Sequence, residues 1–218
     1  MKTVALIPIK LGSKRVPGKN IKPFFDGTSL MSFIQQACLD AGNIDEVYIY
    51  CSDDAVRPYV LPGVKYLKRP EYLDGDNINA NDFIREFMNN VDADIYVNAH
   101  TTSPFAKPST IAELVDRVAS GAYDSAFCAE SLRTFMWQDG KPINFDPDHF
   151  PRTQDLPLIY GETSIAYVFT KDSFLKHNRR LGSHPYIKEV DKIEAMDIDY
   201  PEDFDIANAV YKEVIKKA

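Results

Sequence analysis

This sequence of 218 residues has little cysteine and no long apolar run. Its three cysteines, Cys38, Cys51 and Cys128, form no CxxC motif, which favours buried thiols in a reducing compartment. No apolar run approaches the roughly 18 residues that a membrane span requires. The apolar run Val4–Ile9 is too short for a signal peptide, since a loop with Lys and Pro follows it directly. We therefore expect a cytoplasmic protein with no membrane contact.

The sequence also lacks an excess of basic residues, because 25 Lys and Arg stand against 32 Asp and Glu, for a net charge of −7. A nucleic-acid-binding protein normally has a basic surface, so we expect no nucleic-acid partner. This charge still allows a local basic pocket for a polyphosphate. The four histidines show no HxxxH or HxH spacing for a metal site, and only His100, just before Thr101–Pro104, is a candidate for a functional role.

Two glycine-rich phosphate-binding motifs are absent, GxxxxGK[ST] of the P-loop and GxGxxG of dinucleotide-binding folds. Ser13 and Ser103 have no evident His–Asp partnership, so a hydrolase triad is not expected. The 44% of hydrophobic residues and 12% of aromatic residues are enough for a sizeable core. Together with the length, they predict a single α/β domain of residues 1–218.

Short apolar runs alternate with segments whose apolar residues recur at helical spacing, a pattern typical of a mostly parallel sheet flanked by helices. A capping-box pattern from Thr110 to Glu113 predicts a helix that ends near Gly121. A last helix is predicted to begin at Pro201, with acidic residues in its first turn. Further helices are expected at 29–41 and 82–91, and strands at 3–9, 47–51, 64–67, 95–99, 125–129 and 165–169.

Residues 132–162 lose clear periodicity and are rich in Pro, Asp and aromatic side chains. We interpret this segment as a small inserted arm, either a substrate loop or a dimerisation element, within the single domain. Its Phe135, Met136 and Trp137 are suited to stacking on a ligand or to packing in a dimer contact, and the sequence leaves both open.

The first predicted strand leads into a loop at 10–20 that holds four cations, two glycines and a serine. In an open α/β sheet, ligands bind beyond the carboxyl ends of the strands, where this loop begins. Glycines let backbone N–H groups approach phosphate oxygens, and Lys or Arg offsets their charge. The pattern predicts a triphosphate-binding loop, with a solvated basic turn as the alternative.

A second polar segment, Asp197-Ile198-Asp199, precedes the helix at Pro201. Carboxylates at i and i+2 of an extended segment point the same way and can reach one hard cation. Mg²⁺ favours one or two carboxylates completed by water and phosphate oxygens. The segment predicts a Mg²⁺ site, with acidic helix capping as the alternative.

Five sequence blocks together resemble the CMP-sugar-acid synthetase family, above all the acylneuraminate cytidylyltransferases. The loop at 10–20 resembles the family pattern [AP]RxxSKRxPxKN, and Asp197–Asp199 followed by Glu202–Phe204 resembles its DIDxxxD ending. The segments similar to RPxxL, TSPL and R[TS]QDLP are Lys68–Leu73, Thr102–Pro104 and Arg152–Pro157. The five blocks keep the family's order over nearly the whole chain.

The resemblance implies a Rossmann-like nucleotide-diphospho-sugar transferase fold. It implies transfer of CMP from CTP to a nonulosonic or related sugar acid, with release of pyrophosphate and a requirement for Mg²⁺. A substrate hydroxyl would attack the α-phosphorus in line, and positioning and charge neutralisation would supply most of the acceleration. The resemblance further implies a homodimer and a role in cell-surface polysaccharide biosynthesis.

The resemblance also assigns roles to individual residues. The nucleotide-binding residues would be Lys10, Gly12, Ser13, Lys14, Arg15, Lys19 and Asn20, with Arg69, Asn79, Ala80 and Asn81 at the cytosine. The acceptor would contact Thr102, Ser103, Lys107, Arg152, Gln154, Tyr160, Glu162 and Thr163. The catalytic residues would be Lys10, Lys19, Asp197 and Asp199, the last two as metal ligands.

Three positions depart from the family pattern. Lys10 stands in place of the usual Arg and keeps its charge without the bidentate geometry. Ala106 replaces an Arg, for which Lys107 is a possible stand-in, and Thr163 replaces an Asn. The last two changes remove donors, so we expect N-acetylneuraminic acid to be a poor substrate, although Arg152 should still bind the acidic group. A smaller or differently substituted acid, or one with an amino group that Glu162 can receive, should be better.

Two other functions remain open on the sequence alone. The same fold could transfer CMP to a phosphonate or a phosphorylated alcohol. It could also be a catalytically silent nucleotide-binding scaffold, although retention of Lys19, Asp197 and Asp199 argues against this.

Overall fold

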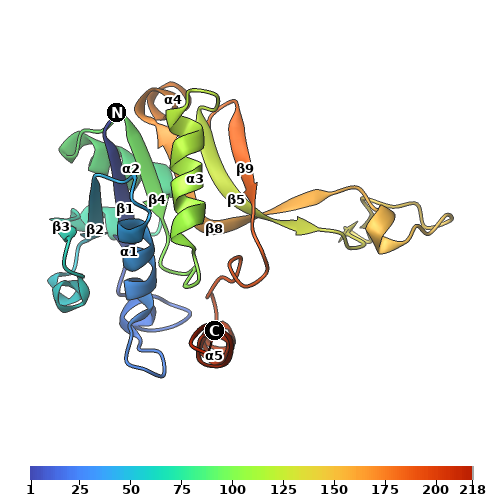
Figure 1. The fold of residues 1–218 in the computed structure, drawn as a ribbon, viewed down its shortest axis with the longest axis horizontal. Coiled ribbons are helices and arrows are strands. Elements are labelled where there is room, and N and C mark those ends of the chain that lie inside the picture. Colours follow the sequence, from blue (N-terminus) through green and yellow to red (C-terminus); the bar gives the residue numbers. More distant parts are fainter. Residues whose placement is uncertain (218) are drawn as a thin grey trace.

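The computed structural model describes residues 1–217, which are built around a seven-stranded sheet in the order β3-β2-β1-β4-β8-β5-β9 (Figure 1). Strand β8 runs antiparallel to both of its neighbours, and the other strands run parallel to one another. This arrangement confirms the mostly parallel sheet predicted from the sequence. The strands are β1 (Thr3–Ile9), β2 (Glu46–Cys51), β3 (Val64–Lys68), β4 (Ile95–Ala99), β5 (Ser125–Leu132), β8 (Ile159–Thr170) and β9 (Pro185–Glu189).

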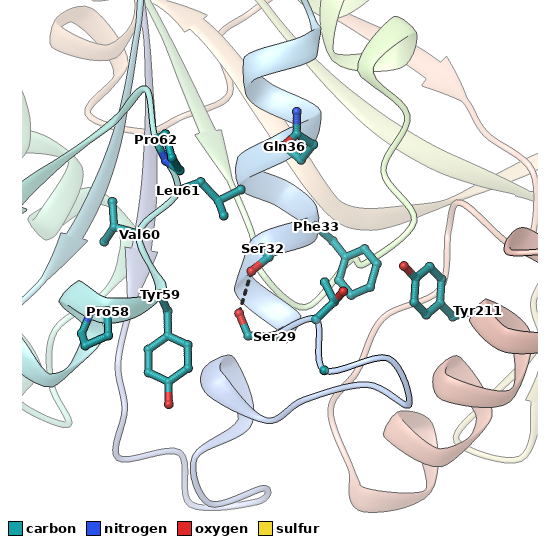
Figure 2. Close-up of a pocket in the computed structure, with 12 residues that line it drawn as sticks. Ser29, Ser32, Phe33, Gln36, Pro58, Tyr59, Val60, Leu61, Pro62 and Tyr211 are labelled. Atoms are coloured by element: carbon teal, nitrogen blue, oxygen red, sulfur yellow. Dashed lines mark hydrogen bonds between the residues drawn. The ribbon is translucent and has the colours of Figure 1, made fainter.

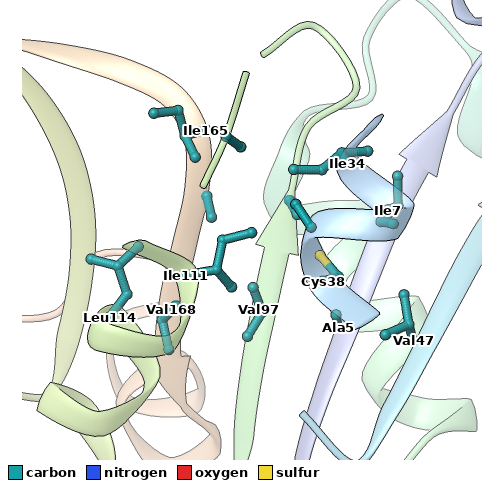
Figure 3. Packing of buried hydrophobic residues seen from close by; sticks show 14 of the residues in the cluster. Ala5, Ile7, Ile34, Cys38, Val47, Val97, Ile111, Leu114, Ile165 and Val168 are labelled. Carbon is teal, nitrogen blue, oxygen red and sulfur yellow. The ribbon is translucent and has the colours of Figure 1, made fainter. Parts of the chain in front are cut away.

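Helices cover both faces of the sheet, and one face packs against α1 and α3. On this face Ile34 and Cys38 of α1 and Ile111 of α3 lie in one buried cluster with Ala5 and Val97 of the strands (Figure 3). The three cysteines are free and buried, as expected from their spacing. The helices are α1 (Leu30–Asp40), α2 (Ala80–Asn90), α3 (Pro108–Ala119), α4 (Lys171–His177) and α5 (Pro201–Val210), which continues as a π-helical turn at Tyr211–Ile215.

The opposite face of the sheet packs against α2 and α4. Phe87 of α2 and Phe174 of α4 lie in a second buried cluster with Val4 and Leu6 of β1. Successive residues of β1 therefore point into different clusters, as the alternation of a strand requires. Because both faces are covered, β1 reads as a continuous apolar run.

Helix α4 and strand β9 were not predicted from the sequence. Both are short, and β9 (Pro185–Glu189) is only partly buried at the edge of the sheet, so its residues show little apolar periodicity.

The capping box proposed at Thr110 is wrong. Helix α3 begins at Pro108 with Lys107 as its N-cap, so Thr110 already lies inside the first turn. A proline at the first helical position sets φ without losing a helical hydrogen bond, which explains the earlier start.

The segment between β5 and β8 projects from the sheet as a long arm (Figure 1). At its end are a short hairpin of β6 (Trp137–Gln138) and β7 (Lys141–Pro142) and a 3₁₀ turn, η4 (Thr153–Asp155). The predicted inserted arm is therefore present, with Leu132 and Ile159–Glu162 forming the strands that carry it. None of the described helices is long and apolar enough to cross a membrane.

Candidate active site

Three of the predicted sequence blocks meet beyond the carboxyl ends of β1 and β4. Lys19, in a 3₁₀ turn η1 (Lys19–Ile21) that ends the loop after β1, donates from Nζ to the carbonyl of Ile198 at 2.6 Å. The backbone N–H of Ile198 in turn donates to the carbonyl of Thr102 at 2.9 Å. Segments near residues 19, 102 and 198 are therefore joined by hydrogen bonds, although about a hundred or more residues separate 198 from the other two.

Lys19 is held inside this junction. Its residue is 7% exposed, and its Nζ lies 3.8 Å from the Asp199 carboxylate. Burial lowers the pKa of Lys19, while the charges of Asp199 and Asp197 act against that shift. Asp199 also accepts a hydrogen bond from Arg15 at 2.7 Å. Two cations of the loop at 10–20 thus lie beside the same carboxylate.

Asp197 has the features of a metal ligand. Its Oδ1 is buried and has no hydrogen-bond partner among the described residues. Its pKa is raised, first by burial, and the nearby charge of Asp199 raises it further. A hard cation would relieve both the unpaired oxygen and the repulsion between the carboxylates. Residues 1–217 contain no group of three or more His, Cys, Asp or Glu placed to hold a metal, so phosphate and water oxygens would complete a Mg²⁺ shell.

Asp203 fixes the shape of the segment that carries these two carboxylates. Its carboxylate accepts hydrogen bonds from the N–H groups of Asp199 at 2.9 Å and Tyr200 at 2.7 Å. It therefore caps α5 and orients Asp199 at the same time. From the sequence, Asp203 was assigned to the helix's acidic first turn and to the DIDxxxD-like ending, and its role in positioning Asp199 was not predicted.

Other residues of the loop at 10–20 form hydrogen bonds and an ion pair with neighbouring segments. Lys10 donates from Nζ to the Asp74 carbonyl, and Lys14 forms an exposed ion pair with Asp76 at 3.0 Å. Asn20 donates to the carbonyl of Lys10 at 3.0 Å and accepts from the Thr101 hydroxyl at 2.6 Å. Asn20 therefore joins the loop after β1 to the loop after β4, and its role at the nucleotide stays a prediction. Gly12 and Ser13 lie in the same loop.

Arg69 is buried beneath the ends of β1 and β2. One terminal nitrogen donates to the Ile9 carbonyl at 2.9 Å and pairs with Asp74 at 2.5 Å, while the backbone N–H of Arg69 bonds to Cys51. Beside it is a cavity of about 270 Å³. Its lining includes Lys10, Arg69, Gly75, Ile78, Phe83 and His100.

The segment Asn79–Asn81 forms the start of α2 next to this cavity. The Asn79 side chain accepts from the N–H of Asn81 at 2.8 Å, and Asp82 accepts from the N–H of Asn79. In the described chain Asn79, Ala80 and Asn81 do not line the cavity, whereas Ile78 does. The structure therefore brings Arg69 to the cavity and gives Asn79 a helix-capping role.

The acceptor residues expected from the sequence divide into two groups. Ser103 and Thr163 are buried, and their hydroxyls have no hydrogen-bond partner among residues 1–217. Arg152 and Gln154 instead lie on the projecting arm, where Arg152 pairs with Asp155 at 2.8 Å and its side chain is 74% exposed. The arm of one chain therefore does not carry Arg152 to the junction around Lys19 (Figure 1). Tyr160 is exposed at the start of β8.

Lys107 is occupied at the start of α3. Its Nζ forms ion pairs with Asp191 at 2.5 Å and Glu194 at 3.3 Å, and its backbone N–H also donates to Glu194. With its charge paired in this way, Lys107 does not act as a substitute for the arginine that Ala106 replaces.

A polar cluster beside the junction was not predicted. The Tyr167 hydroxyl donates to Glu162, and the guanidinium carbon of Arg180 lies 3.4 Å from the centroid of the Tyr167 ring. Burial raises the pKa of Tyr167, and its hydrogen bond to Glu162 raises it further, so Tyr167 stays a neutral donor. Of these residues, only Glu162 was a candidate from the sequence, and Arg180 carried no motif signal.

His100 belongs to this cluster as a neutral side chain. Burial, together with the Arg180 charge, lowers its pKa to about 3. Asn98 Nδ2 at 3.1 Å and an Arg180 nitrogen at 3.5 Å both face His100 Nε2. Since both of these groups are donors, Nε2 accepts and the ring proton lies on Nδ1.

A second cavity, of about 600 Å³, lies between the start of α1 and residues 58–62 (Figure 2). The hydroxyls of Ser29 and Ser32, 2.7 Å apart, lie at its wall, and Tyr211 closes one side. None of the residues that line it is charged. It therefore offers no cation for a triphosphate, and the junction around Lys19 remains the candidate active site.

Comparison with known proteins gives consistent results. The profile of the cytidylyltransferase family matches residues 4–217. N-acylneuraminate cytidylyltransferase A of Danio rerio is 28% identical over 213 residues, which cover 93% of this chain and 49% of that protein. Pseudaminic acid cytidylyltransferase of Campylobacter jejuni is 24% identical over 226 aligned positions and 97% of both chains. The chain thus spans about half the length of the N-acylneuraminate enzymes and nearly all of the pseudaminic acid enzyme.

A solved structure shares the fold. The structure of CMP:2-keto-3-deoxy-manno-octonic acid synthetase complexed with CTP superposes with a TM-score of 0.76 at 19% identity, covering 98% of this chain and 99% of that one. The likeness supports the Rossmann-like nucleotidyltransferase architecture.

Proposed function

The chain belongs to the cytidylyltransferase family, and we propose that it transfers CMP from CTP to a sugar acid, with release of pyrophosphate. The observation that carries this proposal is the junction in which Lys19 and Arg15 share Asp199 beside the unpaired oxygen of Asp197. The names of the N-acylneuraminate and pseudaminic acid enzymes support a sugar acid as acceptor. Attack by an acceptor oxygen on the α-phosphorus breaks its bond to the β-phosphate oxygen, and pyrophosphate leaves.

Cations of the loop at 10–20 would bind the triphosphate. Lys19 is desolvated and aimed at the carboxylates, so its charge acts strongly on the phosphate group that develops negative charge. Arg15 reaches the same carboxylate from the exposed side and can offer its remaining donors to phosphate oxygens. Lys10 and Lys14 with the backbone of Gly12 and Ser13 complete the loop.

Asp197 and Asp199 would hold Mg²⁺, which supplies charge stabilisation for the phosphate groups when it is bound. Asp203 keeps Asp199 oriented through its two hydrogen bonds to the backbone. The cavity beside Arg69 would receive the cytosine, with Arg69 fixed by the strand carbonyls and Asp74. Asn20 would keep the two loops in register around the nucleotide.

The acceptor would lie between Thr102–Ser103 and the middle of β8. Thr163 and Ser103 supply unpaired hydroxyls there, and Glu162 supplies a carboxylate. Ala106 is buried without a donor, and Lys107 is held by Asp191 and Glu194. The loss of a cation at 106 supports an acceptor that differs from N-acetylneuraminic acid.

The arm would join two chains into a homodimer. Its end exposes Trp137 and Phe150, which pack against Phe135 and Phe145 at centroid distances of 5.1–5.4 Å. An exposed aromatic cluster on a projecting hairpin is suited to burial against a second copy. In such a dimer Arg152, Gln154 and Tyr160 would become acceptor contacts.

Because CTP is a cytoplasmic nucleotide, we place the protein in the cytoplasm, in the synthesis of activated sugar acids for cell-surface polysaccharide.

Pyrophosphate release tests the proposal. The assay combines the protein with CTP, Mg²⁺, pyrophosphatase and malachite green, and varies the acceptor over sugar acids, a phosphonate and a phosphorylated alcohol. We expect release that needs both CTP and a sugar acid. Release only with the phosphonate or the alcohol would change the acceptor class, and CTP binding without release from any acceptor would indicate a silent nucleotide-binding protein.

A further inference from the structure

Arg180 is a partly buried cation whose one ion pair among the described residues, with Glu162, is long. It follows α4, its side chain is only 25% exposed, and its guanidinium stacks on the Tyr167 ring. Its nearest carboxylate among the described residues, Glu162, lies at 3.8 Å and already accepts a hydrogen bond from Tyr167. The remaining polar contact, to His100 Nε2 at 3.5 Å, is long. Most of the guanidinium donors therefore have no close acceptor among residues 1–217.

The other arginines near the site differ in this respect. Arg69 is satisfied by the Ile9 carbonyl and Asp74, and Arg15 pairs with Asp199. Arg152 pairs with Asp155 and is mostly exposed, so water and its partner already compensate its charge. A desolvated guanidinium with unused donors favours an incoming carboxylate, which can bind both terminal nitrogens.

The surrounding fold fixes Arg180 in place. In the β5–β8 pair, Phe127 lies opposite Tyr167 and Ala129 lies opposite Glu162. Between these two pairs β5 advances by two residues and β8 by five, so β8 contains a bulge. This bulge brings Glu162 onto the same side as Tyr167, so their hydrogen bond can form beside the guanidinium. Neutral His100 adds an acceptor without adding a positive charge.

The cluster also adjoins residues proposed for the substrates. Glu162 is the chain neighbour of Thr163, whose hydroxyl has no partner among residues 1–217. His100 faces Arg180 and also lines the cavity next to Lys10 and Arg69, so it links Arg180 to that cavity.

We propose that Arg180 binds the carboxylate of the sugar-acid acceptor, with Glu162 and Tyr167 as positioning residues that hold its guanidinium. This inference rests on the proposed function, and it assigns the acid-binding role to Arg180 in place of Arg152. The acceptor's carboxylate oxygens would accept hydrogen bonds from the two terminal nitrogens, leaving its reacting hydroxyl toward Asp197 and Lys19.

The test compares a sugar acid with its C1 methyl ester, which keeps the carbon skeleton and removes the negative charge. An octulosonate and N-acetylneuraminic acid, each with its ester, are titrated calorimetrically into the protein with CTP and EDTA, so that no turnover occurs. For the acid that the wild-type protein binds better, we expect a preference over its ester of about 30-fold or more, the value of a charge-assisted bidentate contact. In Arg180→Gln this preference should fall to a few-fold, while Arg180→Lys should retain part of it.

Arg179 serves as the matched control. It is the adjacent residue and bonds to the Gly182 carbonyl, so Arg179→Gln should keep the full preference for the acid. Arg152→Gln tests the competing residue: because Arg152 would contact the acceptor from the partner's arm, this variant should weaken binding of acid and ester alike and keep the preference between them. Loss of the preference in Arg152→Gln and its retention in Arg180→Gln would overturn the inference in favour of the arm.

Turnover measurements separate the remaining possibilities. In the pyrophosphate assay Arg180→Gln should raise the KM for the acid and leave the KM for CTP unchanged, whereas a raised KM for CTP would assign Arg180 to the nucleotide and overturn the inference. If wild-type protein releases no pyrophosphate, the proposed function fails, but the acid-to-ester preference still decides the role of Arg180. Equal binding of acid and ester by wild-type protein overturns the inference in either case.

Discussion

Arg15 and Asp199 are 184 residues apart in the chain, and their side chains meet at 2.7 Å. The ion pair links the loop after the first strand to the segment before the last helix. Lys19 lies 3.8 Å from the same carboxylate, so two cations and two carboxylates, Asp197 and Asp199, come together in the candidate site. Nucleotidyl transfer depends mainly on positioning and charge neutralisation, which such an arrangement can supply.

Asp199→Asn should lower turnover by roughly 1,000-fold or more with little change in melting temperature, because a bound metal contributes several kcal/mol to transition-state stabilisation. Asp205 lies exposed on the first turns of α5, so Asp205→Asn is the matched control and should keep wild-type turnover. The measurement is kcat at saturating CTP over a range of Mg²⁺ concentrations. Near-normal kcat of Asp199→Asn at ordinary Mg²⁺ would remove Asp199 from the metal site.

Lys19→Ala should depress kcat more than it raises the KM for CTP. Its buried charge lies beside the carboxylates, where it acts on charge that grows in the transition state. Lys22 lies in the same segment but stacks on Phe204, so Lys22→Ala provides the comparison. The measurement is kcat and the KM for CTP of both variants, from steady-state kinetics. A change confined to the KM for CTP in Lys19→Ala would make that lysine a binding residue.

Asp203→Ala should lose about 1–3 kcal/mol in the free energy of unfolding, because the N–H groups of Asp199 and Tyr200 lose their acceptor. Asp203→Asn keeps an acceptor oxygen and should retain most of both stability and turnover. Denaturant unfolding and kcat are measured together for the two variants. Equal loss of turnover in both would show that the charge of Asp203, and not its hydrogen bonds, is what matters.

The neutral His100 should make the fold less stable in mild acid. Its pKa is about 3 in the folded protein against an ordinary value of 6.5, so below pH 6.5 the unfolded chain binds a proton that the folded chain does not. Stability attributable to His100 is therefore intact above pH 6.5 and falls progressively toward pH 3, by on the order of 1 kcal/mol by pH 5. Asn98, Arg180 and Tyr167 face the ring, and none of them carries a negative charge near pH 5 that would favour its protonation.

His100→Gln keeps a side-chain acceptor and removes the titration. Its unfolding free energy should therefore fall less than that of the wild type between pH 7 and pH 5, as measured by urea denaturation. Parallel pH profiles of the two proteins would contradict the assignment of a neutral, buried ring.

N-acetylneuraminic acid should be a poorer substrate than an octulosonate or its amino derivative. Ala106 and Thr163 remove donors that the family pattern supplies, and Lys107 is engaged with Asp191 and Glu194. A site that lacks a matched donor discriminates strongly against the group that needs it. The comparison is kcat/KM for these acids and for a simple phosphonate. A clear preference for N-acetylneuraminic acid at ordinary efficiency would show that these substitutions do not set the acceptor.

The sequence by itself determined the layers of the fold and the two segments that meet in the candidate active site. Apolar periodicity reports burial directly, so strands such as Ile95–Ala99 and the helix after Ser29 were predicted close to their observed bounds. Lys19 and Asp199 were recognisable because short motifs keep their chemistry local. Edge elements such as β9 were missed, since partial burial leaves no strong pattern.

Only the tertiary structure decided which of these residues meet and in what state. The bulge in β8 depends on strand pairing, and it turns Glu162 toward Tyr167 and Arg180. Burial and hydrogen bonding then make His100 neutral and leave Arg180 without a close anion, while the projecting arm carries Arg152 away from the junction. Desolvation and long-range contacts are properties of the packed chain, and no local run of residues encodes them.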